Sequence, residues 1–368
     1  MRAARPLILF AFAVACGDPP APTDAKPAGA KPVDTAPRED PFAKGDAKGP
    51  PVRNDGTIYA ESELMGTHVS VNLWLESDRT ATEAGVAIQA AFDEISRIER
   101  LTSEWMPTSE LSRLNAAAGG DMMTLSPELF AVLLRSREVS ERSGGAFDVT
   151  FHAVGELWTF TPGSKPPSKA AIAAKLSLVD WRRIELDAAT RKGRLATAGM
   201  KVGLGAIAKG YAVDRASDLL IARGFHNHIV EGGGDTYVAG TKAGKQWSVG
   251  VQDPGRKGVV GVLPSSDIAV VTSGDYERFF EFEGKRYAHI LDPKTGAPLL
   301  EESSCKSITA VAANATDADA YATAIAVLGP ERGMALVEEV PDLEAIIITR
   351  DDEVLVSSGL RSTFVPIE

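Results

Sequence analysis

Residues 206–240 read AIAKGYAVDRASDLLIARGFHNHIVEGGGDTYVAG, and they decide the fold class. The first part predicts a helix over residues 206–223, which Gly224 ends. The segment HIV then predicts a strand, which leads through EGGGD at 231–235 into a second strand, TYVAG. A helix followed by a hairpin, rather than by a lone parallel strand, favours an α+β fold over a strictly alternating α/β fold.

The rest of the chain repeats this mixture. Alternating or buried-type apolar runs predict strands at 67–75, 268–272, 344–349 and 353–357, and a hairpin of 279–282 with 285–290. Helical spacing and start signals predict helices at 80–101, 126–143, 317–328 and 331–340. We therefore expect an α+β domain with helices packed on its sheets.

Composition sets broad limits on function. The chain has 368 residues, of which 44% are hydrophobic, enough for a sizeable core. Its mean hydropathy of -0.05 argues against a polytopic membrane protein. The net charge of -11 argues against a nucleic-acid partner bound through a broad basic surface. An anionic ligand would need a local cation, a metal or helix N-termini.

The N-terminal residues are predicted to form a signal peptide followed by a disordered linker. Residues 1–16, MRAARPLILFAFAVAC, carry Arg2 and Arg5 before a short apolar stretch and resemble a bacterial lipoprotein signal, in which Cys16 becomes lipidated. Plain secretion is the alternative. Residues 17–55 hold nine of the 22 prolines and predict a disordered linker, so residues 56–368 form the folded domain.

The cysteines predict no disulfide. If Cys16 is acylated, only Cys305 remains in the chain. Cys305 precedes the strand-like SITAVAA, so we expect it to be a small buried hydrophobic residue.

Two glycine-rich segments are candidates for ligand contact. VGLGAIAKGY at 202–211 approaches a helix with Lys209 in the first turn, which could hold a phosphate, although ordinary tight packing explains the glycines as well. In EGGGD, three glycines would let a ligand or another backbone come close, or would simply form a turn.

Two polar positions suggest catalysis. Asp319 and Thr323 are four residues apart, so on a helix their oxygens share one face and would suit Mg²⁺; an acidic helix N-terminus is the alternative. His289 precedes the turn DPKTG and is either a general base or a structural histidine. His226 and His228 would share one strand face, but no third zinc ligand follows at a convincing spacing.

Eight segments in series carry a family resemblance. They are MGT at 65–67, SEW with SELSRLN from 103 to 115, GGAFDVT at 144–150, GAIAKGYAVD at 205–214, EGGGD at 231–235, TSGDY at 272–276, HILDPKTG at 289–296 and DAYATA at 319–324. In this order they resemble the ApbE family, the FAD:protein FMN transferases. The resemblance implies an ApbE-like, T-fold-related arrangement of mixed sheets with packed helices.

The resemblance also implies a reaction and its partners. FAD would be split at its pyrophosphate with Mg²⁺, FMN would be attached to a Thr or Ser hydroxyl of an acceptor protein, and AMP would leave. The implied acceptors are flavoproteins with an FMN-binding domain, such as subunits of the Na⁺-translocating NADH:quinone reductase or of Rnf-type complexes. The implied location is an exported lipoprotein that faces the periplasm and is held to the membrane by a lipid anchor.

The family pattern assigns roles to residues. It implies Mg²⁺ on Asp319, Thr323 and the backbone carbonyl of Ala206, with Asp319 and His289 as catalytic residues. The residues implied to contact FAD are Met65, Trp105, Ala146, Phe147, Asp148, Lys209 and Ile290.

Two positions depart from the pattern. Gly203 stands where the family usually has Asp, and Phe151-His152-Ala153 stands where a Gly-Pro pair is usual. We expect these differences to affect FAD affinity or ring placement. Two further functions stay open: an FAD pyrophosphatase that uses water in place of the acceptor hydroxyl, and an FAD-binding lipoprotein without turnover.

Overall fold

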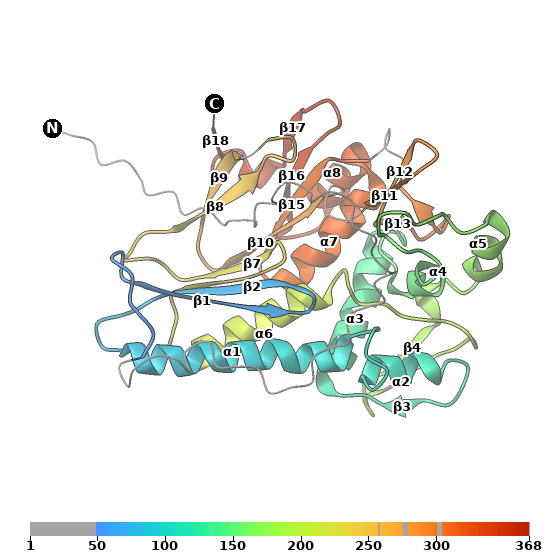
Figure 1. Ribbon diagram of the computed structural model, residues 1–368, viewed down its shortest axis with the longest axis horizontal. Helices are drawn as coiled ribbons and strands as arrows, with labels where there is room; N and C mark the ends of the chain where they lie inside the picture. Colours follow the sequence, from blue (N-terminus) through green and yellow to red (C-terminus); the bar gives the residue numbers. More distant parts are fainter. Residues whose placement is uncertain (1–48, 257, 275–278, 300–303, 368) are drawn as a thin grey trace.

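The computed structural model describes residues 49–256, 258–274, 279–299 and 304–367 (Figure 1). The expected signal, Cys16 and most of the expected linker lie outside these residues. The last residues of that linker contact the domain, because the Asp55 carboxylate accepts from the Thr57 hydroxyl at 2.7 Å and pairs with Lys242. Within the described ranges, no helix combines the length and apolar composition needed to cross a membrane.

A large antiparallel sheet organises the domain. Its eight strands lie in the order β1 (Thr57–Leu64), β2 (Thr67–Trp74), β6 (His228–Gly232), β7 (Asp235–Ala239), β10 (Ile268–Gly274), β15 (Ser307–Ala312), β16 (Glu344–Ile348) and β17 (Val354–Val356). Every pairing in it is antiparallel. The expected helix-then-hairpin unit is confirmed as α6 (Ala208–Ala222) followed by β6 and β7.

Strand alternation gives the sheet two buried faces. In β10, Ala269 and Val271 belong to the main core, whereas Val270 between them belongs to a second core. Successive side chains on a strand point to opposite faces, so the two clusters lie on either side of the sheet. The domain therefore has three layers.

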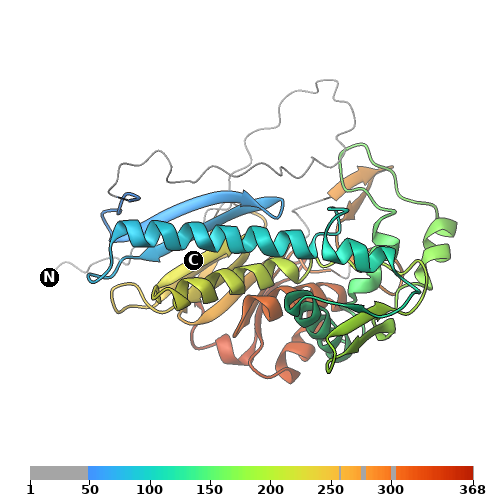
Figure 2. The same ribbon diagram turned by 90° about the horizontal axis from the view of Figure 1, so that it is seen from below.

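Helices cover one face of the sheet. They are α1 (Ala81–Thr102), α6 and α7 (Ala315–Leu328), and α8 (Pro330–Glu339) packs beside α7. Figure 2 shows α1 and α6 lying side by side across this face. A reciprocal capping box starts α1: the Glu83 N–H donates to the Thr80 hydroxyl, and the Thr80 N–H donates to the Glu83 carboxylate. Its buried stripe then faces the sheet.

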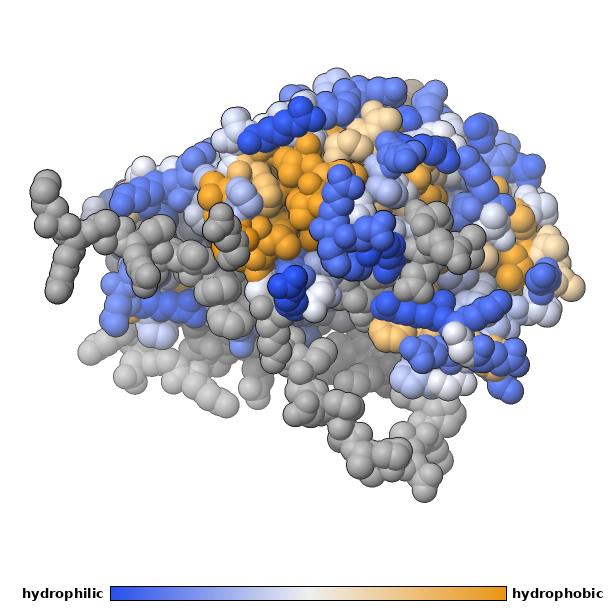
Figure 3. Space-filling model, turned by 90° about the horizontal axis from the view of Figure 1, so that it is seen from above, coloured by the Kyte–Doolittle hydropathy of each residue, from blue (hydrophilic) through white to orange (hydrophobic). Residues whose placement is uncertain are grey.

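A small sheet covers the other face. It consists of β8 (Trp247–Gln252), β9 (Val259–Ser265) and β18 (Val365–Pro366), and it lies above the large sheet in Figure 1. Trp247, Val249 and Val251 of β8 point into the second core with the short η4 (Ser358–Leu360). Figure 3 shows apolar side chains gathered on this upper side of the molecule.

The remaining elements cluster at one end of the molecule (Figure 1). The helices there are α2 (Glu110–Ala116), α3 (Pro127–Arg142), α4 (His152–Gly155) and α5 (Lys169–Leu176), with short turns η1 (Val149–Phe151) and η2 (Trp181–Arg183). The strands form three small sheets: β3 (Met123–Thr124) with β5 (Lys192–Leu195) and β4 (Ile184–Asp187), β11 (Phe279–Phe282) with β12 (Lys285–Ala288), and β13 (Leu291–Asp292) with β14 (Ala297–Pro298).

Candidate active site

Lys209 stands at the centre of a buried charge cluster. Its Nζ lies 2.8 Å from Oδ2 of Asp235 and 3.4 Å from Oδ1 of Asp319. The Lys209 side chain is 27% exposed, whereas the two carboxylates are 2% and 3% exposed. One half-buried ammonium thus faces two buried carboxylates, so the cluster carries a net negative charge only while both carboxylates are ionised.

The cluster forms where α6 begins. The described side chains give α6 no cap, and the backbone N–H of Gly210 donates instead to Oδ2 of Asp319 at 3.3 Å. The first N–H groups of a helix carry a partial positive charge that favours an anion. The N-terminus of α6 therefore supports Asp319 and adds to the field at this point.

Burial governs the protonation of Asp235. It raises the pKa of Asp235 well above its ordinary value, and the charge of Asp319 raises it further, while Lys209 acts in the opposite direction. Two carboxylates this close do not both ionise readily with a single ammonium. A cation added to the cluster would relieve the repulsion.

A tight turn brings Asp235 to the cluster. Gly233 and Gly234 form a two-residue loop between β6 and β7, with φ of 60° and 91°. Positive φ at both positions is the type I′ hairpin geometry, which glycine adopts without steric cost. EGGGD therefore forms the expected turn, and Asp235 is the residue that follows it.

A close helix contact brings Asp319 to the cluster. A Cβ on Gly210 would lie 2.1 Å from the carbonyl oxygen of Ala315, so only glycine lets α6 approach the start of α7. Asp214, one turn further along α6, accepts from the backbone N–H groups of Ala315 and Thr316 at 2.7 and 2.8 Å. These contacts fix Lys209 on α6 against Asp319 on α7.

The donor set fits a hard divalent cation. Thr323 lies one turn after Asp319 on α7, so both face the same side of that helix, and the carbonyl of Ala206 belongs to the turn that precedes α6. Among the described residues, no three His, Cys, Asp or Glu side chains gather at a metal site. A metal here would thus combine carboxylate, hydroxyl and carbonyl oxygens, which is the ligand type of Mg²⁺.

Met65 lies beside Lys209. It occupies the two-residue turn between β1 and β2, with a φ of 53°, and it lines a small cavity with Lys209, Val213 and Gly232. A non-glycine residue in the left-handed region costs about 1 kcal/mol, and such strain is concentrated at functional sites.

Trp105 and the segment 146–148 lie at the turn before α6. The Glu104 carboxyl lies at this turn, because a Cβ on Gly205 would lie 3.8 Å from its Oε1, and Trp105 is the next residue in the chain. Burial raises the pKa of Glu104. The Gly203 N–H donates to the carbonyl of Val149 at 2.9 Å, so residues 146–149 lie against the same turn.

The side chains of Phe147 and Asp148 are engaged in the fold. Phe147 is buried in the main core. The Asp148 carboxylate accepts from the Thr150 hydroxyl at 2.6 Å and from the Trp181 backbone at 3.1 Å. The backbone of 146–148 and the side chain of Trp105 are therefore what this region offers to a ligand.

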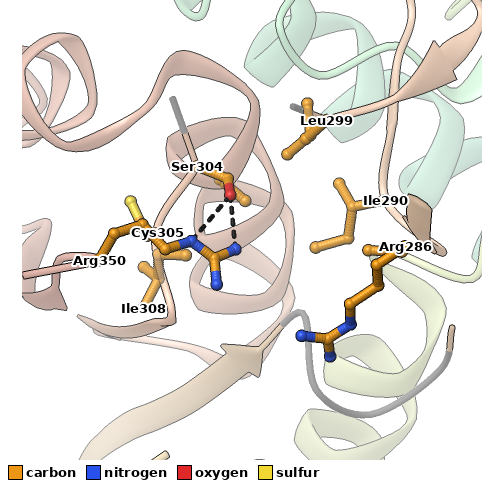
Figure 4. Close-up of a pocket in the computed structure, with 9 residues that line it drawn as sticks. Arg286, Ile290, Leu299, Ser304, Cys305, Ile308 and Arg350 are labelled. Atoms are coloured by element: carbon orange, nitrogen blue, oxygen red, sulfur yellow. Dashed lines mark hydrogen bonds between the residues drawn. The ribbon is translucent and has the colours of Figure 1, made fainter. Parts of the chain in front are cut away.

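His289 and Ile290 follow β12. Both are half-buried, and Ile290 lines a pocket with Leu299, Cys305 and Ala326 of α7 (Figure 4). Two guanidinium groups border this pocket, and that of Arg350 donates to the Ser304 hydroxyl at 2.6 Å. Cys305 is buried, as expected. Asp275 and Tyr276 of the TSGDY segment lie outside the described residues.

Two site residues were missed by sequence reasoning. Asp235 was quoted within EGGGD but given no role of its own, although a carboxylate at the start of an apolar strand is itself a signal. Glu104 was quoted within a motif but given no role, and no local pattern indicated its place beside Gly205.

The family assignment follows from sequence comparison. Residues 65–347 match the ApbE family. The chain belongs to that family. A relative from Treponema pallidum, named FAD:protein FMN transferase, is 37% identical over 321 residues, which cover 82% of this chain and 87% of that protein. A Klebsiella pneumoniae protein of the same name is 31% identical, with 86% and 96% covered.

Solved structures agree with this ApbE assignment. The crystal structure of the ApbE protein from Thermotoga maritima superposes with a TM-score of 0.75 at 29% identity and covers 83% of this chain and 99% of that one. The flavin transferase ApbE from Vibrio cholerae gives the same TM-score and coverage at 26% identity. The α+β fold predicted from the sequence is confirmed as the ApbE fold.

Proposed function

We propose that this chain is an FAD:protein FMN transferase, which moves FMN from FAD to a Thr or Ser hydroxyl of an acceptor flavoprotein. The observation that carries the proposal is the buried Lys209–Asp235–Asp319 cluster at the start of α6. Cleavage of a pyrophosphate requires groups that stabilise its negative charge. This cluster brings together an ammonium, a helix N-terminus and oxygen donors for a cation.

The reaction is a displacement at phosphorus. The acceptor hydroxyl oxygen bonds to the phosphorus of the FMN half of FAD, and the bond from that phosphorus to the bridging oxygen breaks. AMP leaves with that oxygen. An imidazole nitrogen of His289 takes the hydroxyl proton, because a Ser or Thr hydroxyl is too weak an acid to ionise alone at neutral pH.

Each remaining residue has a binding task in this proposal. Lys209 meets a phosphate oxygen, Met65 and Ile290 contact FAD, and Trp105 presents a ring face for stacking, while residues 146–148 contribute backbone. Asp319, Thr323 and the Ala206 carbonyl hold Mg²⁺. When bound, the metal would offset charge on the pyrophosphate and on the departing AMP.

We also propose that the protein acts outside the cytoplasm of a bacterium, as a lipoprotein anchored through Cys16 and facing the periplasm. The support is the leader sequence at 1–16 and the proline-rich segment after it. The proposed acceptors carry an FMN-binding domain, as in subunits of the Na⁺-translocating NADH:quinone reductase or Rnf-type complexes.

A mass spectrum of the acceptor tests the reaction. The purified chain is incubated with FAD, Mg²⁺ and a protein that carries an FMN-binding domain. We expect the acceptor to gain the mass of FMN minus water, and EDTA to abolish the gain. Release of free FMN and AMP with an unmodified acceptor would show a pyrophosphatase instead. Intact FAD bound to the chain would show a binding protein.

A further inference from the structure

His152 occupies the space of a missing side chain at residue 203. Gly203 is buried, and a Cβ built on it would lie 3.0 Å from both Cβ and Cγ of His152. Contacts this short are tighter than about nine in ten real Cβ contacts, so one of the two groups would have to move. A larger residue at 203 therefore requires the imidazole at 152 to shift, so the two departures from the family pattern are in direct contact.

The imidazole of His152 also meets the most exposed large apolar side chain among the described residues. Trp105 is 68% exposed, and its ring centroid lies 6.0 Å from that of His152 with the planes at 88°. The two rings form the sides of a right angle next to the turn that leads into Lys209.

The charge state of His152 suits contact with a flat ring. Burial lowers the pKa of His152; the charge of the nearby Glu156 acts in the opposite direction, and Lys201 adds a smaller lowering. The imidazole is therefore neutral at pH 7, and it combines an aromatic face with one donor and one acceptor nitrogen. A neutral ring can stack on a heterocycle without the cost of burying a charge.

We infer that His152 is an FAD-binding residue, whose imidazole forms with the Trp105 indole a two-sided aromatic wall for one of the ring systems of FAD. His152 contacts Gly203, its imidazole lies at a right angle to the exposed Trp105 indole, and only a short run of backbone separates this wall from Lys209. The inference rests on the proposed function, because it takes FAD as the substrate.

Binding measurements on the purified protein test this wall. The Kd for FAD is measured by flavin fluorescence, without acceptor, for the wild type, His152→Ala, His152→Phe and His226→Ala. We expect His152→Ala to raise the Kd about tenfold, the loss of one aromatic contact. His152→Phe should stay within threefold, because the ring is kept. His226, exposed at the far end of α6, is the matched control and should have no effect.

Kinetic measurements show whether His152→Ala weakens FAD binding specifically or disturbs the structure of the whole site. We expect His152→Ala to raise the KM for FAD by the same factor as the Kd, with a change in kcat of less than threefold. Titrations with ADP and with FMN then identify the ring: a loss of ADP affinity places adenine on the wall, and a loss of FMN affinity places the flavin there. If His152→Ala leaves the Kd for FAD, ADP and FMN unchanged, the inference is wrong.

A double variant tests the coupling. Gly203→Asp alone should weaken FAD binding more than tenfold, because the new side chain displaces the imidazole. Combining it with His152→Gly should recover at least part of that loss. If Gly203→Asp binds FAD as tightly as the wild type, the two positions do not compete. A wild type that fails to bind FAD would instead refute the proposed function, so the two failures are distinguishable.

Discussion

Lys209 Nζ lies 2.8 Å from Asp235 Oδ2, and this ion pair joins the start of α6 to the start of β7. The two residues are close because a hairpin turn and a helix start meet at one end of β6 and β7, in the middle of the large sheet. The ammonium is the more exposed partner, so it faces an incoming substrate while the carboxylate holds it from behind.

Replacing Lys209 tests the role of this ammonium. We expect Lys209→Ala to lower the transfer rate by about 10²-fold or more, the loss typical of removing one preorganised electrostatic contact. The variant should also unfold at a lower temperature, because it leaves two buried carboxylates without their cation. Lys245→Ala removes an exposed lysine and serves as the control. Acceptor mass spectra give the rates, and wild-type activity in Lys209→Ala would exclude Lys209 from the site.

Asp319 is expected to control the response to Mg²⁺. Binding of Mg²⁺ at ten times its Kd should stabilise the wild type by about 1.4 kcal/mol. Asp319→Asn should abolish this stabilisation together with transfer, because it removes the one charged ligand of the proposed set. Asp342→Asn, at an exposed loop position, is the matched control. A melting-temperature shift with Mg²⁺ that persists in Asp319→Asn would place the metal elsewhere.

His289 is expected to act on the acceptor proton. We predict that His289→Asn slows transfer by about 10²- to 10⁴-fold, the range for loss of a general base. Single-turnover transfer at saturating FAD measures the loss, and the Kd for FAD is determined in parallel. A rise in Kd large enough to account for the slower transfer would mean that His289 holds the substrate instead of moving a proton.

Gly210 sets the distance between α6 and α7. A Cβ there would meet the Ala315 carbonyl oxygen at 2.1 Å, so Gly210→Ala must push the helices apart. We expect a loss of more than about 2 kcal/mol in unfolding free energy despite the better helix propensity of alanine. Gly205→Ala is the comparison, because its Cβ would make only an ordinary contact at 3.8 Å. Equal stability of the two variants in urea would contradict this account.

The buried His228 gives the fold a pH dependence. Its ring nitrogens lie 2.8 Å from the Ser217 hydroxyl and 2.9 Å from the Phe225 carbonyl, and burial lowers its pKa to about 4. Below pH 6.5, the ordinary pKa of histidine, His228 binds a proton in the unfolded chain, whereas in the folded chain it stays neutral down to about pH 4. Its contribution to stability is therefore complete above pH 6.5 and is lost as the pH falls towards 4.

The loss should amount to about 3 kcal/mol over this interval. The measurement is urea unfolding of the wild type and of His228→Gln at pH 7 and pH 4. All other titrating groups are the same in the two proteins, so their contributions cancel in the difference between the two unfolding free energies. We expect the stability difference between the two proteins to shift against the wild type at pH 4. A difference independent of pH would show that His228 does not resist protonation.

Local patterns predicted most of the fold. The helix expected at 317–328 is α7 (Ala315–Leu328), and the strand expected at 268–272 is the core of β10, because apolar periodicity reports which face is buried. Helix α5 was not predicted, since none of its residues is buried and it therefore carries no apolar stripe. Strand β8 was overlooked, although its alternating burial is visible in WSVGVQ.

The site was predictable only in part. Lys209 and Asp319 were candidates from local sequence features and from the family pattern, and Met65 from the family pattern alone; the structure brings Lys209 close to each of the other two. The partnership of Lys209 with Asp235 and the contact of Gly203 with His152 join segments far apart in the chain. Such contacts depend on how the layers pack, which no local spacing encodes.

The contact of Asp55 with Lys242 has a mechanical consequence. The chain enters the domain there, at the first residue of β1, and Met65 lies at the other end of that strand, about 25 Å away for eight extended residues. A pull on the N-terminal lead would load the β1–β2 ladder lengthwise, in shear, where many hydrogen bonds share the force. Met65, which lines a cavity with Lys209, would lie at the end of β1 opposite to the point of loading.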